Sequence, residues 1–213
     1  MSELNNLTPL FKQFYDVKSQ CPGAILFFRV GDFYETYGED AVTTSKELGI
    51  TLTSKEVSNG DRIPMAGVPH HAVEPYLSKM VRKGYRVAIA EQMEDPKKAK
   101  GLVKRDIVRI VTAGTVLEDR LLEEKQNNYL ISIVIDGEGQ AIAVADISTG
   151  AFRVSFITDE HNSMEALKSE ISRLKPAECL IEEKERNNNV LMTFLKELTA
   201  ITVREDACFN YDT

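Results

Sequence analysis

The apolar run from Ala24 to Phe28 is the feature that most constrains the fold of this chain. The run is short, follows Cys21-Pro22-Gly23 and continues only to Val30 before a glycine. A short apolar segment bounded by turn residues is typical of a buried strand. Directly after it comes Gly31-Asp32-Phe33-Tyr34-Glu35, so the strand is expected to lead into a turn that carries two aromatic rings and two carboxylates.

The rest of the first half predicts further strands and helices around this one. Thr8-Pro9 offers an N-cap followed by proline at the first helical position. We expect Ser58–Asp61 to be a hairpin tip and the loop holding Ile63–Gly67 to be exposed. The other predicted elements are helices over Asp40–Leu48 and Glu74–Lys83 and strands over Ile50–Thr53, Tyr85–Ala90 and Asp106–Thr112.

The second half predicts three consecutive strands and then alternating helix and strand. The predicted strands are Tyr129–Ile135, Ala141–Ile147, Phe152–Ile157, Cys179–Ile181 and Ile201–Val203, and the predicted helices are Met164–Leu174 and Val190–Leu198. The charged stretch between the halves predicts a linker. We therefore expect a mixed α/β protein with one domain over residues 1–115, a linker over 116–128 and a second domain over 129–213.

Charge is distributed unevenly between the two halves. The chain of 213 residues carries a net charge of −7, which divides into +2 for residues 1–115 and −9 for residues 116–213. An acidic second half repels a polyanion, so any DNA contact is expected in the first half. Neither a secretory pattern nor an apolar run long enough to span a bilayer is present, and Cys21, Cys179 and Cys208 are expected to be reduced thiols.

Phe33 and Glu35 suggest DNA chemistry, although each also has an ordinary structural reading. An apolar ring can insert between stacked bases and kink the duplex. A nearby carboxylate can accept a hydrogen bond from a base edge while it repels phosphates. However, an aromatic residue after a strand is most often part of a core, and Asp32 and Glu35 could simply favour a helix N-terminus. The residues alone favour the structural reading.

Three blocks of sequence resemble the bacterial MutS DNA mismatch-repair proteins, and this resemblance reverses the preference. The first is the mismatch-sensing block, Phe28-Arg29-Val30-Gly31-Asp32-Phe33-Tyr34-Glu35. The others are Ile63-Pro64-Met65-Ala66-Gly67-Val68-Pro69-His70-His71-Ala72 and Val108-Arg109-Ile110-Val111-Thr112-Ala113-Gly114-Thr115. They occur in the family's order and at about its spacing, and the similarity weakens after about Phe152. The chain is thereby identified as a mismatch-recognition domain followed by part of a ribonuclease H-like connector domain, truncated within it.

The resemblance implies that Phe33 stacks on a mispaired or unpaired base from the minor groove and that Glu35 hydrogen-bonds the displaced base. Unstacking costs least where pairing is already defective, so Phe33 would read deformability rather than one base. Val30 and Met65 would support it in the groove, although valine suits a strand and methionine a core equally well. Tyr34 is open between core packing and a DNA contact.

Basic residues supply the remaining DNA-contact candidates. By resemblance, Lys55 touches the DNA backbone, whereas its own surroundings suggest only a solvated side chain. Residues 97–105 hold five positive charges and no negative charge, as a solvated loop or as a phosphate contact. The candidates in that stretch are Lys97, Lys98, Lys100, Lys104 and Arg105, of which Arg105 best matches a family motif.

The family's ATPase is not expected in this fragment, because the chain contains no P-loop motif and no Gly-Lys pair. We therefore expect no enzyme activity and no cofactor here. The resemblance implies that the full-length protein is a homodimeric, ATP- and magnesium-dependent clamp. Its implied partners are double-stranded DNA with mismatches or small insertion loops, and MutL through the connector. It would work in the cytoplasm, at the nucleoid when bound to DNA, without a membrane partner.

Two other classes of function stay open from the residues. The carboxylates Asp32, Glu35, Glu39 and Asp40, or Asp136 and Asp146 in the ribonuclease H-like sheet, could suggest a metal-dependent nuclease. No converging set is evident, and the family's connector is not catalytic. His70, His71 and His161 lack metal-ligand spacing, so capping and packing are expected instead and no metal site is predicted. The acidic half could also be a protein-interaction module without a DNA role.

Overall fold

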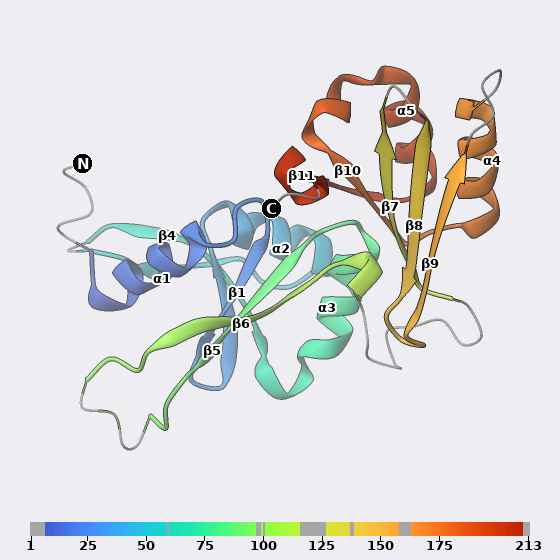
Figure 1. Ribbon diagram of the computed structural model, residues 1–213. Helices are drawn as coiled ribbons and strands as arrows, with labels where there is room; N and C mark the ends of the chain where they lie inside the picture. The colour runs from blue at the N-terminus through green and yellow to red at the C-terminus, as the bar shows by residue number, and fades with distance from the viewer. Residues whose placement is uncertain are drawn as a thin grey trace. The chain divides into compact units, whose positions relative to one another are not determined.

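The structure is a computed structural model that describes residues 7–58, 60–96, 99, 101–115, 127–136, 139–157 and 163–210. The chain divides into two compact units, Met1–Val111 and Thr112–Thr213 (Figure 1). Each contains one mixed β-sheet with helices packed on it. The mixed α/β class expected from the sequence is therefore confirmed. Within the described ranges, no helix has the length and apolar composition needed to cross a bilayer.

The first unit is built on a six-stranded sheet in the order β3-β4-β2-β1-β5-β6. Its only parallel pair in that order is β1 with β5, and β1, the first predicted strand, lies near the middle (Figure 1). Its elements are α1 (Pro9–Ser19), β1 (Ile25–Val30), β2 (Phe33–Tyr37), α2 (Glu39–Leu48), β3 (Thr53–Glu56), β4 (Arg62–Pro69), α3 (Val73–Arg82), β5 (Val87–Gln92) and β6 (Arg105–Val111).

Helix α1 covers part of one face of this sheet. Phe11, Phe14 and Val17 of α1 pack in one buried cluster with Leu26 and Phe28, which alternate along β1. Phe27 and Tyr34 occupy the alternate positions of β1 and β2, so their side chains lie on the opposite face of the sheet. Helices α2 and α3 contact β1, β4 and each other. On the face under α1, Leu26 and Phe28 are fully buried, whereas Phe33, the first residue of β2, is 47% exposed.

Two expected elements of this unit differ in the structure. Ile50–Leu52 forms no strand, because Leu52 is 45% exposed and the pairing with β4 begins only at Thr53. Ile63–Gly67, expected in an exposed loop because of its prolines, lies in β4 between β3 and β2. Pro64 lies one position beyond the paired stretch with β2, and Pro69 ends the strand, so neither proline interrupts the ladder with β2 in its middle.

The second unit is a five-stranded sheet in the order β11-β10-β7-β8-β9, with β7, β8 and β9 antiparallel and β10 and β11 parallel to β7. This is the strand order of the expected ribonuclease H-like fold. Helices α4 and α5 bury Leu167, Ile171, Leu191 and Leu195 against it. Its elements are β7 (Tyr129–Ile135), β8 (Gln140–Asp146), β9 (Ala151–Ile157), α4 (Ser163–Leu174), β10 (Glu178–Glu182), α5 (Asn189–Leu198) and β11 (Ala200–Arg204).

The first compact unit ends at Val111, four residues before the end expected for the first domain. The short 3₁₀ turn Ala113–Thr115 belongs to the second unit, where Gly114 N–H donates to the Glu178 carboxylate at 2.9 Å. Glu178 is 2% exposed, so this bond satisfies a buried charge that would otherwise be costly. Most of the expected linker, residues 116–126, falls outside the described residues.

Candidate nucleic-acid interface

The turn between β1 and β2 presents the Phe33 ring to solvent. Val30 pairs with Phe33 across a turn of two residues, Gly31 and Asp32. Gly31 has a φ of 58°, a value that favours glycine, and glycine at the first central position is typical of a two-residue hairpin. Phe33 is 47% exposed, whereas the four residues that follow it in β2 are buried. The strand therefore holds an aromatic ring in the open at its first residue.

This turn is fixed from both sides. Arg29 donates from Nε to the Gly31 carbonyl at 2.5 Å, and the His70 N–H donates to the Asp32 carbonyl at 2.9 Å. His70 follows directly on β4, where Pro69 pairs with Phe33. His70 thus supports the turn, whereas the helix-start capping expected for the histidines is not seen, since neither helix start that follows β4 has a side-chain cap; His161 is outside the described residues. The exposed ring is carried by an anchored hairpin.

Five of the residues singled out from the sequence lie on one face of the first sheet. Side chains alternate between the faces of a strand, so the register places paired residues together. Phe33 of β2 is paired with Val30 of β1, and Glu35 lies two residues further along β2. Tyr37, two residues after Glu35, is paired with Met65 of β4. Met65 is also paired with Thr53 of β3, and Lys55 lies two residues after Thr53. The residues that share the face are Val30, Phe33, Glu35, Lys55 and Met65.

Val30 and Met65 are less exposed than Phe33 and have a structural role. Both are partly buried and pack against the cluster under α1. The structure thus gives each residue its ordinary role, Val30 as a strand residue and Met65 as a packed side chain. Their proposed support of Phe33 in a DNA groove stays a prediction.

Glu35 is buried beside Phe33 and is already paired. Its residue exposure is 9%, and Oε2 accepts hydrogen bonds from Tyr37 Oη and Lys55 Nζ, both at 2.5 Å. Lys55 therefore forms an ion pair in place of the freely solvated side chain suggested by its surroundings. The second oxygen, Oε1, accepts no hydrogen bond from any described residue.

Gly67 lies opposite Glu35 on β4 and leaves the space beside it open. A Cβ placed on Gly67 would be 3.8 Å from Glu35 Cγ and 3.9 Å from Phe33 Cδ1. These are ordinary contact distances, so packing does not require glycine there. Because residue 67 is glycine, β4 adds no side chain beside the ring and the carboxylate at this position.

Tyr34 is placed in the core rather than on the interface. It is 6% exposed, points to the face opposite Phe33 and donates its hydroxyl hydrogen bond to Glu91. Burial, and then this hydrogen bond, raise the pKa of Tyr34 to about 12. Of the two readings that the sequence left open, the structure favours core packing.

The basic candidates do not form one surface in the described residues. Lys97, Lys98 and Lys100 are outside them. The Lys104 side chain is 71% exposed and lies 3.6 Å from an Asp106 carboxylate oxygen.

Arg105 is a buried side chain with several partners in the protein. It is only 6% exposed and donates to the Val103 carbonyl at 2.8 Å, to Gln13 Oε1 at 3.0 Å and to the Arg29 carbonyl at 2.5 Å. Its guanidinium also lies over the Phe28 ring, 5.1 Å from the centroid, and burial lowers its pKa. The geometry supports a structural cation in place of the phosphate contact that the motif position suggested.

The acidic candidates for a nuclease site have separate structural partners. Asp40 accepts Leu26 N–H at 2.9 Å and Lys18 Nζ at 2.6 Å, while Glu35 pairs with Lys55. Asp32 is exposed on the hairpin turn. Among the described residues, no three His, Cys, Asp or Glu side chains are grouped to hold a metal ion. The structure therefore offers no observation in favour of the nuclease reading.

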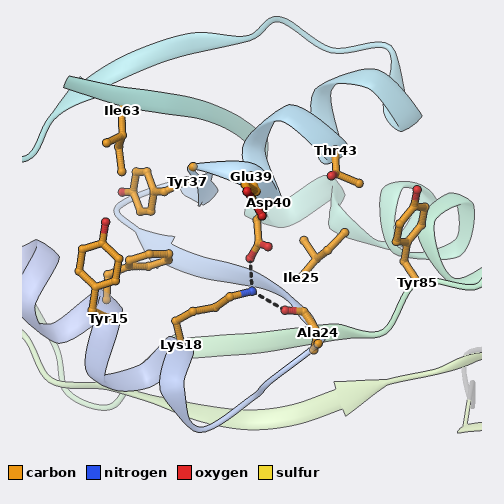
Figure 2. Close-up of a pocket in the computed structure, with 13 residues that line it drawn as sticks. Tyr15, Lys18, Ala24, Ile25, Tyr37, Glu39, Asp40, Thr43, Ile63 and Tyr85 are labelled. Atoms are coloured by element: carbon orange, nitrogen blue, oxygen red, sulfur yellow. Dashed lines mark hydrogen bonds and ion pairs between the residues drawn. The ribbon is translucent and has the colours of Figure 1, made fainter. Parts of the chain in front are cut away.

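A cavity of about 480 Å³ adjoins the Asp40 ion pair, and Figure 2 shows its lining. Lys18 extends across it and donates to Asp40 and to the Ala24 carbonyl, both at 2.6 Å. Tyr37 and Ile63 stand together on the other side of the opening. Lys18 and Asp40 neutralise each other, and the Glu39 carboxylate lies on the same lining, so the cavity shows no cluster of like charge that would mark a ligand site.

Asp146, at the end of β8, caps a turn. Its Oδ1 accepts Ser148 N–H at 3.0 Å and the Ser148 hydroxyl at 2.6 Å. Burial raises the pKa of Asp146, but the hydrogen bonds from Ser148 and Thr149 outweigh it and leave the pKa below its usual value. These contacts account for Oδ1, whereas Oδ2 is buried without a hydrogen-bond partner among the described residues.

Replacing Asp146 by asparagine is expected to destabilise the chain at neutral pH by about 1 kcal/mol, because a neutral amide oxygen accepts the hydrogen bonds of Ser148 more weakly than a carboxylate does. A lowered pKa in the folded state gives stability that is full above the unfolded pKa of about 4 and is lost as the pH falls through the folded pKa. Urea unfolding should therefore show a larger difference at pH 7 than near pH 3. The exposed Glu205→Gln variant is the control, and a difference as large near pH 3 as at pH 7 would contradict the assignment.

Sequence reasoning missed two residues of the site, Tyr37 and Gly67. Tyr37 follows Glu35 by two positions, so strand alternation alone could have placed it on the same face. Gly67 carried no comparable signal, because its importance depends on β4 lying beside β2. Its role therefore required the tertiary pairing.

Comparison with known proteins agrees with both units. The family model described as MutS domain I matches residues 8–120, and that described as MutS domain II matches residues 128–213. A fowlpox virus Holliday junction resolvase overlaps 39% of this chain and 65% of its own, with a TM-score of 0.30 and 17% identity. That likeness is too weak to bear on function.

Curated relatives extend the match over most of the chain. The DNA mismatch repair protein MutS of Methanothrix thermoacetophila is 52% identical over 82% of this chain and 20% of its own length, and that of Desulforamulus reducens is 50% identical over 82% and 20%. That of Methanosarcina mazei is 43% identical over 92% of this chain and 23% of its own length. The chain thus spans about a fifth of the length of these relatives. The protein described by these two units belongs to the MutS family of DNA mismatch-repair proteins, of which it comprises domains I and II.

Proposed function

We propose that the first unit recognises mispaired or unpaired bases in double-stranded DNA. Phe33 inserts from the minor groove at the defective step and stacks on one base, and Glu35 accepts a hydrogen bond from the displaced base. Unstacking costs a few kcal/mol per step and least where pairing is already lost, so the ring selects weak points of the duplex. The exposure of Phe33 on an anchored hairpin, beside a carboxylate whose Oε1 accepts no hydrogen bond from the described residues, carries this proposal.

The placement of Glu35 gives the interface its selectivity. A carboxylate near an intact duplex faces phosphate charges and finds no free base-edge donor at normal stacking. Opening of a mismatch supplies that donor, so the penalty becomes a hydrogen bond. Lys55 shares the face and is proposed to exchange its ion pair with Glu35 for a phosphate when DNA is present. Lys97, Lys98, Lys100 and Lys104 are proposed to add phosphate contacts.

Substituting Glu35 by alanine tests this proposal in the full-length protein. We expect affinity for a fully paired duplex to rise about fivefold, near 1 kcal/mol, since one surface-proximal repulsion is removed. Affinity for a mismatched duplex should rise less or fall, because the hydrogen bond is lost as well. Titrations of both duplexes by fluorescence anisotropy at one salt concentration measure the ratio.

Glu91→Ala is the matched control for Glu35→Ala. It removes one carboxylate from the same sheet, on the opposite face where Glu91 accepts from Tyr34. The ratio of mismatched to paired affinity should stay at its wild-type value in this variant. An unchanged ratio in Glu35→Ala, or equal changes in both variants, would refute the proposed role of Glu35.

The full-length protein is proposed to work as a homodimeric clamp in the cytoplasm that binds ATP with magnesium outside the two units described, and to contact MutL through the second unit. Family membership and the relatives' greater length support this. Measuring ATP hydrolysis by the full-length protein, with and without mismatched DNA, tests the ATPase part of the proposal. Absence of hydrolysis under both conditions would contradict it.

A further inference from the structure

Tyr37 ends β2 on the same face as Phe33 and Glu35, and its ring is held rigidly. It is 3% exposed. The ring packs edge-on against Phe11 at 4.8 Å and 62° and against Phe14 at 4.8 Å and 86° between centroids and planes. Edge-to-face aromatic pairs favour one relative orientation. The core therefore determines where the Tyr37 hydroxyl lies.

That hydroxyl points at the carboxylate that the proposed function uses. Tyr37 Oη donates to Glu35 Oε2 at 2.5 Å. Burial, and then the hydrogen bond with Glu35, raise the pKa of Tyr37 far above its ordinary value, so the hydroxyl keeps its proton. Lys55 Nζ reaches the same oxygen and lies 3.3 Å from Tyr37 Oη. Two donors thus hold Oε2, and Oε1 is left without a donor from the described residues.

The two donors differ in rigidity. The Lys55 side chain is 28% exposed and ends in a flexible ammonium group that can turn to a phosphate. The Tyr37 hydroxyl is fixed by the aromatic packing and stays in place when Lys55 leaves. Fixing a side chain before binding removes part of the entropic cost of ordering it in the complex.

We propose that Tyr37 is a positioning residue for mismatch readout, whose hydroxyl holds Glu35 by one oxygen so that the other is presented to the displaced base. This inference rests on the proposed role of Glu35. Without the hydroxyl, the carboxylate has Lys55 as its remaining partner on this face and samples more rotamers. A smaller fraction of the protein is then competent to accept from the base, and apparent affinity falls by that fraction. Fully paired DNA makes no such bond and should be bound as before.

Tyr37→Phe in the full-length protein tests the inference, with Tyr34→Phe as the matched control. Each variant removes one tyrosine hydroxyl of β2 that is bonded to a glutamate, and only the first does so on the interface face. We expect Tyr37→Phe to weaken binding to a mismatched duplex about five- to tenfold, on the scale of a hydrogen bond to a charged group. Binding to the paired duplex should change less than about twofold. Tyr34→Phe should leave the ratio of the two affinities at its wild-type value.

Repeating Tyr37→Phe in the Glu35→Ala background separates positioning from structural damage. If Tyr37 acts through Glu35, the second substitution has no further effect on the affinity ratio. An equal loss in both backgrounds, or a wild-type ratio in Tyr37→Phe alone, would overturn the inference. If Glu35→Ala itself leaves the ratio unchanged, the proposed function of Glu35 has failed and the inference with it. Thermal unfolding of both tyrosine variants checks that they are folded to the same extent.

Discussion

Phe33→Ala in the full-length protein is expected to lower affinity for mismatched DNA by about 30-fold, equivalent to about 2 kcal/mol for one base stacked on an aromatic ring. Affinity for fully paired DNA should change little, since no base is unstacked there. The ring is 47% exposed and lies outside the buried cluster under α1, so its removal should leave the unfolding temperature unchanged. The ability to discriminate is lost while the fold is kept.

Titration of both duplexes, together with thermal unfolding, measures this. Phe33→Tyr keeps a ring and should retain most of the discrimination. Phe152→Ala removes another exposed phenylalanine, 70% exposed on β9 of the second unit, and serves as the matched control. A Phe33→Ala protein with wild-type preference for mismatched DNA would show that another group reads the duplex.

Phe28→Ala is expected to destabilise the chain by about 3–5 kcal/mol, the usual cost of removing a fully buried aromatic side chain. Phe28 is 0% exposed, packs edge-on against Phe14 at 5.5 Å and lies beneath the Arg105 guanidinium. It is also the cross-strand partner of Glu35. Its loss would leave a cavity directly behind the interface and a buried cation with less support.

Urea unfolding of the chain, followed by circular dichroism, gives the change in free energy. Phe156→Ala is the control, because this phenylalanine is 78% exposed and its removal should cost less than about 0.5 kcal/mol. A loss under about 1 kcal/mol for Phe28→Ala would contradict the packing described here.

Much of the fold could be predicted where apolar pattern and turn chemistry agreed. The apolar run at Ala24 and the Gly49 helix end marked β1 and α2 because each signal is local. The strand predicted at Ile50–Leu52 does not form, because a few apolar and β-branched residues predict a strand whether or not a neighbouring strand is present to pair with. Pro64 favoured a loop where the structure has a strand, because the cost of a proline in a sheet depends on which neighbouring strand its missing N–H would face.

The interface residues divide in the same way. Phe33 and Glu35 could be named from a motif that resembles a family, and the register then placed them on one face. Tyr34 and Arg105 could not be assigned from the same motif, because burial, which depends on the packed sheet, determines whether a polar side chain faces solvent. Lys55 gained its partner only when β3 folded beside β4.

The amino-acid sequence by itself determined the mixed α/β class, two domains, the family resemblance and the aromatic residue at the turn, since all of these are properties of neighbouring residues. Only the tertiary structure decided which oxygen of Glu35 is held by Tyr37 and Lys55, and that Gly67 leaves the face open beside it. These contacts join residues from β2, β3 and β4, and no local pattern specifies the distance between their side chains until hydrogen bonding sets the register of the strands.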